Sequence, residues 1–72
     1  MIENIDDMSK TIDVLLKLSD DKKLVIEYET YGSCCIAVPN YIVWILKNGE
    51  KISSKALEVE NSLEYLLKKA QN

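Results

Sequence analysis

The chain is predicted to form one α+β domain over residues 1–72, an antiparallel three- to four-stranded meander flanked by an N-terminal and a C-terminal helix. Three observations predict this class. Apolar residues recur at helical spacing near both ends, the middle of the chain alternates between apolar and polar residues, and short turn signals separate the alternating runs. Seventy-two residues allow one domain and no more. The predicted order is α-β-β-β-(β)-α.

The first helix is predicted over residues 5–19, because apolar side chains there repeat every three or four positions. Asn4 is a candidate N-cap, and Asp6 and Asp7 place negative charge at the positive end of the helix dipole. The apolar stripe comprises Ile5, Met8, Ile12, Leu15 and Leu16, widened by Val14 and Leu18.

The middle of the chain is predicted to form strands joined by tight turns. Asn48-Gly49 is the strongest hairpin signal, because both residues tolerate positive φ. The predicted strands cover residues 23–30, 34–38, 41–47 and, as a short edge strand, 50–53, with turns at 31–33, 39–40 and 48–49.

The C-terminal helix has two possible starts. Ala56, Val59 and Leu63 fit a helix that begins near Ser54, which is the interpretation we favour. Asn61 and Glu64 instead resemble a capping box, which would begin the helix at Asn61 and leave the preceding residues extended.

The turns predict how the strands pair. A two-residue turn at residues 39–40 sets Val38 opposite Tyr41, and a three-residue turn at 31–33 sets Tyr28 opposite Ile36 and Ile26 opposite Val38. This register gathers apolar residues on one face, which is expected to carry both helices. The face comprises Leu24, Ile26, Tyr28, Ile36, Val38, Val43, Ile45 and Ile52.

The opposite face of the sheet is unusually apolar on its central strand, where Ile42, Trp44 and Leu46 point outward. A solvated sheet face normally carries polar residues, so this stripe predicts an interaction surface. Three alternatives remain: one helix covers each face and Trp44 is core, the face binds a second copy, or it binds another partner. The face would also hold Val25, Cys35 and Ala37, edged by Glu27 and Glu29.

The residue inventory disfavours several function classes. The chain has no His, and all nine of its basic residues are Lys. Without His, Ser–His or Cys–His nucleophiles cannot form within the chain, and the commonest metal ligand is missing. Without Arg, and at a net charge of −3, nucleic acid would be repelled overall. We therefore expect no enzymatic activity, no cofactor, no metal and no direct nucleic-acid binding.

The cysteines and the hydropathy predict a cytoplasmic protein. Cys34 and Cys35 are adjacent, which disfavours a disulfide between them, and reduced thiols fit the cytosol. The longest apolar run, residues 41–46, is far shorter than a membrane span. We also expect no signal peptide, since the start lacks a basic region followed by an apolar stretch.

The acidic residues have two interpretations. They are most simply a solvated shell. Alternatively, an acidic face could mimic phosphate spacing and compete for a basic nucleic-acid groove. The residues concerned are Asp6, Asp7, Asp13, Asp20, Asp21, Glu27, Glu29, Glu58, Glu60 and Glu64.

Three resemblances bear on function. The α-β-β-β-α order resembles a double-stranded RNA-binding domain, although that family's Lys-rich helix start is absent and its RNA binding is not carried over. The segments Val38-Pro39-Asn40, Gly49-Glu50-Lys51-Ile52-Ser53, Ala56-Leu57 and Ser62-Leu63 resemble HicB-type antitoxin domains, which implies a homodimeric regulator of a small operon. In size, charge and layout the chain resembles phage-encoded counter-defence proteins such as anti-CRISPR inhibitors, which implies occupation of a surface on a host complex.

Together these observations predict a non-enzymatic protein-binding module that inhibits or regulates a larger complex such as a CRISPR effector. A homodimeric antitoxin-like regulator and an RNA-binding-domain-like fold without strong nucleic-acid binding are the alternatives. The partner is expected to be a protein, and the chain could also form a homodimer. The predicted protein-binding residues are Trp44, Ile42, Leu46, Glu27, Glu29 and Cys35.

Overall fold

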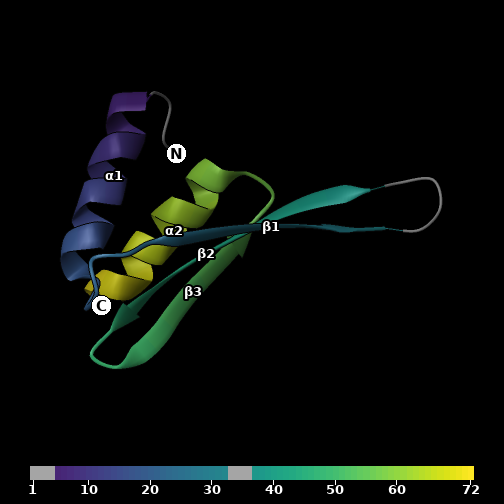
Figure 1. Cartoon of the computed structure of the whole chain (residues 1–72). Coiled ribbons are helices and arrows are strands. Elements are labelled where there is room, and N and C mark those ends of the chain that lie inside the picture. The colour runs from purple at the N-terminus through teal and green to yellow at the C-terminus, as the bar shows by residue number, and fades with distance from the viewer. Residues whose placement is uncertain (1–4, 33–36) are drawn as a thin grey trace.

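The computed structural model describes residues 5–32 and 37–72 and confirms the α+β class (Figure 1). The described elements follow the order α-β-β-β-α, with the three strands in one antiparallel sheet of order β1-β2-β3. They are α1 (Ile5–Leu18), β1 (Val25–Tyr31), β2 (Val38–Lys47), β3 (Glu50–Ala56) and α2 (Val59–Gln71).

Both helices lie on the same side of the sheet, as the sequence predicts. Val43 and Ile45 of β2 are fully buried, and they share one core with Leu15 of α1. The α2 helix completes this core with Leu63, Leu66 and Ala70. The described chain is therefore a two-layer domain, and a sandwich with one helix on each face is excluded.

The helices cover the sheet unevenly. The α2 helix packs against β2 and β3, and α1 packs mainly on α2 and touches only β2 of the sheet. Within the described residues, β1 contacts β2 alone. In Figure 1, β1 and β2 continue away from the helices as an arm, which leaves much of β1 without a covering layer.

The predicted turn at residues 39–40 is wrong, because β2 runs without interruption through Pro39 and Asn40. A proline removes one backbone donor and is normally confined to places where a strand lacks a neighbour. Pro39 meets this condition: it pairs with Thr30 of β1, whereas β3 ends opposite Tyr41. On that side of β2 no described strand needs the missing N–H.

The continuous strand changes the predicted register. Ile26 lies opposite Val43 rather than Val38, and Tyr28 lies opposite Tyr41 rather than Ile36. Val38 moves to the opposite face, because it shares its alternation with Trp44. Ile36 and Cys34, which entered the predicted pairing, lie outside the described residues.

The predicted hairpin turn at Asn48-Gly49 is confirmed. Both residues have positive φ, 54° and 79°, as a two-residue hairpin turn requires. Asp20, just after α1, accepts hydrogen bonds from the Asn48 and Gly49 backbone N–H groups at 3.0 and 2.8 Å. The Gly49 and Asn48 donors lower the pKa of Asp20 below its ordinary value of 3.8. This contact ties the helix to the β2–β3 hairpin.

The last strand is longer, and the last helix shorter, than we favoured from sequence. β3 pairs with β2 as far as Ala56, so the helix cannot begin near Ser54, and it does not wait until Asn61. It begins at Val59, after Glu58 in an extended conformation. Apolar spacing at residues 56–59 suits a helix, but the ten residues of β2 offer a pairing partner, and pairing prevails.

Candidate protein-binding face

The side of the sheet away from both helices is here called the open face. Alternation along the three strands assigns residues to it, since cross-strand partners share a face. Its central stripe is Ile42, Trp44 and Leu46, all partly buried and none packed against the helix-side core. The open face comprises Val25, Glu27 and Glu29 of β1, Val38, Asn40, Ile42, Trp44 and Leu46 of β2, and Lys51, Ser53 and Lys55 of β3.

Two charged side chains hold the Trp44 ring in place. The indole Nε1–H donates a 2.9 Å hydrogen bond to Oε1 of Glu27 on β1. From the opposite edge, Lys51 Nζ of β3 lies 4.5 Å from the centroid of the indole ring, a cation–π distance. The ring therefore has a fixed orientation although no helix of the described chain covers it.

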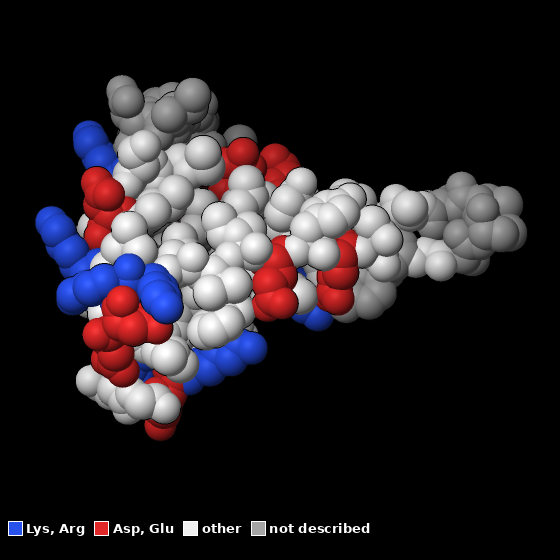
Figure 2. Space-filling model, viewed as in Figure 1, with Lys and Arg blue, Asp and Glu red and all other residues white. Residues whose placement is uncertain are grey.

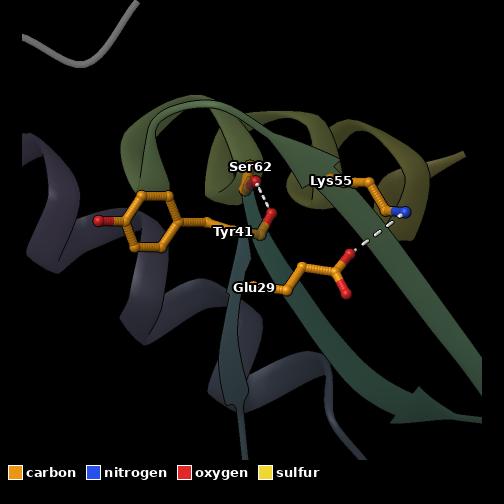
Figure 3. Close-up of polar contacts among 4 residues, drawn as sticks. All are labelled: Glu29, Tyr41, Lys55 and Ser62. Atoms are coloured by element: carbon orange, nitrogen blue, oxygen red, sulfur yellow. Dashed lines mark hydrogen bonds and ion pairs between the residues drawn. The ribbon is translucent and has the colours of Figure 1, made fainter. Parts of the chain in front are cut away.

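A second charged contact crosses the central strand. Lys55 Nζ of β3 lies 3.7 Å from Oε1 of Glu29 on β1, and the two side chains meet over β2 (Figure 3). Glu29 is opposite Asn40 and Lys55 is opposite Ile42, so the ion pair passes between these positions. Asn40 is buried, with 7% exposure, although it is on the open face. Surface ion pairs of this kind contribute about 0–1 kcal/mol, so the pair covers the strand more than it stabilises it.

The open face is charged differently along its two edges. β1 contributes the carboxylates Glu27 and Glu29, and β3 contributes the ammonium groups Lys51 and Lys55. Glu27 and Lys55 lie in the same cross-strand row, on either side of Ile42. The face is an apolar stripe between an acidic edge and a basic edge.

Two polar contacts hold α2 against β2 and β3 on the helix side of the sheet. Ser62, in the second turn of α2, donates its Oγ–H to the backbone carbonyl of Tyr41 at 2.7 Å (Figure 3). The Ser62 side chain is fully buried, so this bond forms away from competing water. Lys69 Nζ also donates to the Ser53 carbonyl at 2.8 Å, near the other end of the helix. The two contacts secure α2 along β2 and β3.

Five of the six predicted binding residues gather on the open face: Glu27, Glu29, Ile42, Trp44 and Leu46. The sixth, Cys35, lies outside the described residues. The predicted binding residues lack Lys51 and Lys55: Lys55 lies beyond the predicted strand 50–53, and Lys51 lies within it on its outward side. The signal was present, since Lys51, Ser53 and Lys55 alternate with the inward Ile52 and Ser54.

A second apolar strip lies on the helix side of β1, where no described helix reaches. Ile26 is 48% exposed and Tyr28 is 58% exposed, although their neighbour Val43 on the same face is fully buried. The Tyr28 ring tilts against Tyr41 at 5.1 Å between centroids. In Figure 2, charged side chains crowd the region of α1, and the uncharged surface beside them is bordered by acidic side chains where the body narrows into the arm.

Other functional features are lacking in the part of the chain that the structure describes. Among residues 5–32 and 37–72, no three His, Cys, Asp or Glu side chains gather as a metal site would require. Neither described helix has the length and apolar character to cross a bilayer.

Comparisons of the chain with protein-family models, with curated proteins and with solved structures found no match in any of the three.

Proposed function

We propose that the chain is a non-enzymatic protein-binding module and that it docks on its partner through the open face. In this role it acts by occupying a surface. The partner is either a component of a larger complex, which the module would regulate or inhibit, or a second copy of the chain in a homodimeric regulator.

The observation that carries the proposal is the position of Trp44. It lies in the middle of an apolar stripe, on the central strand, with no described helix above it. Tryptophan is enriched among the residues that dominate binding energy, which cluster near the centre of an interface. Because Glu27 and Lys51 already hold the indole, little side-chain entropy remains to be lost on binding.

The charged edges support the same interpretation. Binding hot spots are commonly surrounded by polar residues that exclude water and fix orientation. Glu27 and Glu29 on one side, with Lys51 and Lys55 on the other, form such a rim around Ile42 and Trp44. A partner with the opposite arrangement of charge would be oriented along the strands.

Affinity capture with three baits tests the proposal: the unchanged chain, Trp44→Ala and Tyr28→Ala. Tyr28 is the matched control, because it is an exposed aromatic residue of the same sheet on the helix side. Bait is immobilised at low density and exposed both to a lysate of the organism that encodes the chain and to the purified chain itself. Circular dichroism establishes that each bait is folded.

We expect the unchanged chain and Tyr28→Ala to capture the same protein. Trp44→Ala should capture at least tenfold less of it. Equal retention by Trp44→Ala would contradict it. Loss with Tyr28→Ala but not with Trp44→Ala would assign docking to the strip on the helix side of β1 instead. Unfolding of Trp44→Ala would make the indole part of the core and would remove the open face as a docking surface.

A further inference from the structure

We infer that the partner of the open face is a second copy of this chain, packed face to face about a two-fold axis that lies along β2. The inference rests on the proposed function and names the occupant of the same surface. The two edges of the face carry opposite charges, which makes the face complementary to itself.

A two-fold axis between two facing sheets and parallel to β2 exchanges the sheet edges. The β1 edge of one protomer then faces the β3 edge of its partner, which sets an acidic edge against a basic one. This rotation leaves the position along β2 unchanged, so each cross-strand row of one protomer lies opposite the same row of its partner. Glu27 and Lys55 share a row, so each lies opposite the other residue type across the interface. The apolar stripes of the two protomers meet at the axis, with the two copies of Trp44 at the centre.

The other two-fold arrangement is electrostatically unfavourable. An axis perpendicular to β2 places β3 on β3, so that Lys51 and Lys55 meet the same lysines of the partner. Like charges directly opposed across an interface cost free energy and reject that geometry. Both axes leave the strands of the two sheets aligned, as facing sheets prefer, so the edge charges decide between them.

The size of the face predicts a weak dimer. Seven paired residues at about 3.4 Å and three strands at about 4.8 Å give a footprint of roughly 340 Å² before side chains are counted. Standard interfaces bury about 800 Å² per partner. We therefore expect association at micromolar rather than nanomolar concentration, weakened by salt because the edge charges are exposed.

Sedimentation of charge-reversed chains tests the arrangement. One variant carries Glu27→Lys and Glu29→Lys, a second carries Lys51→Glu and Lys55→Glu, and a third carries all four changes. Each reversal alone makes the two edges alike, whereas the four changes together exchange the edges and keep them complementary. Circular dichroism checks that each variant folds, and the unchanged chain is measured from sub-micromolar to millimolar concentration.

We expect a concentration-dependent dimer for the unchanged chain. Each doubly substituted variant alone should associate at least tenfold more weakly. An equimolar mixture of those two variants should restore the dimer. The variant with all four substitutions should dimerise like the unchanged chain. Adding Trp44→Ala to both chains of the mixture should abolish association.

An unchanged chain that stays monomeric at millimolar concentration would overturn the inference. So would two doubly substituted variants that each associate as strongly as the unchanged chain. A monomeric chain would still leave the proposed function standing if a lysate protein is retained by the unchanged chain and lost by Trp44→Ala. If Trp44→Ala keeps both its binding to the lysate protein and its self-association, the inference and the proposed function both fail.

Discussion

The two faces of the sheet differ in how far their apolar side chains are buried. On the helix side, Val43 and Ile45 are fully buried under α1 and α2. On the open face, the neighbouring Ile42, Trp44 and Leu46 are only partly buried, and Glu27 and Lys51 from the edge strands contact the Trp44 ring. One strand thus carries two apolar stripes, of which the described chain covers one.

The two stripes of β2 should contribute differently to the stability of the chain. Burial of an apolar side chain contributes about 1.5–3 kcal/mol relative to exposure, so the helix-side stripe supplies much of the folding free energy. Under the proposal, the open-face stripe is instead available for contact with a partner. Adjacent residues of one strand should therefore respond differently to the same substitution.

The largest expected effect is that of Ile45→Ala. It removes a fully buried side chain from the core and should cost about 2–5 kcal/mol, through lost burial and the cavity left behind. A chain of this length has roughly 4–11 kcal/mol in total, so the variant should be close to unfolding. Urea unfolding followed by circular dichroism measures the loss. A change below 1 kcal/mol would show that the helix side is not the core.

Trp44→Ala should have a smaller effect on folding, about 1–2 kcal/mol, because the ring is partly exposed and loses one hydrogen bond to Glu27 and the cation–π contact with Lys51. The same urea titration, performed at a concentration where the chain is monomeric, measures it. The two neighbours Trp44 and Ile45 then sharpen the comparison of faces directly. Equal destabilisation by the two alanine variants would contradict the distinction.

Ser62→Ala tests how the helix layer is held to β2. It deletes the buried hydroxyl that donates to the Tyr41 carbonyl and should destabilise the chain by about 1 kcal/mol. Gln71→Ala, at an exposed position near the end of α2, is the control and should change little. The self-association expected of the open face should be unchanged in Ser62→Ala, as sedimentation would show.

The smallest expected effect concerns Asp20, which supports the β2–β3 hairpin and belongs to neither face. Its pKa is lowered in the folded chain, so its contribution is present above 3.8 and is lost as pH falls through the lower folded-state pKa. Asp20→Asn should melt below the unchanged chain at pH 7, and the two melting temperatures should converge below pH 3.8. A difference that grows on acidification would contradict this assignment.

Much of the fold follows from local patterns in the sequence. Helical spacing places α1 within one residue of its observed end, and Asn48-Gly49 locates the turn between β2 and β3. The strand alternation also assigns Trp44 to the face away from the helices, because Val43 and Ile45 are alternate neighbours. These features depend on residues close together in the chain.

The errors arise where long-range pairing decides. Pro39-Asn40 is a turn signal locally, but Pro39 is acceptable in β2 because β3 ends before it. The same pairing extends β3 to Ala56 and delays α2 to Val59. Lys55 was missed for this reason, since it lies in the part of β3 that only pairing with β2 reveals, whereas Lys51 lies within the predicted strand.

The most direct test of the open face uses its own fluorophore, since Trp44 is the only tryptophan in the chain. Acrylamide quenching of its emission is measured from sub-micromolar to millimolar chain concentration, with Tyr28→Ala alongside. A docking surface occupied by a second copy predicts quenching that falls as concentration rises, with a blue-shifted emission, in both proteins. Quenching that stays constant across the whole range would contradict burial of Trp44 between two copies of the chain.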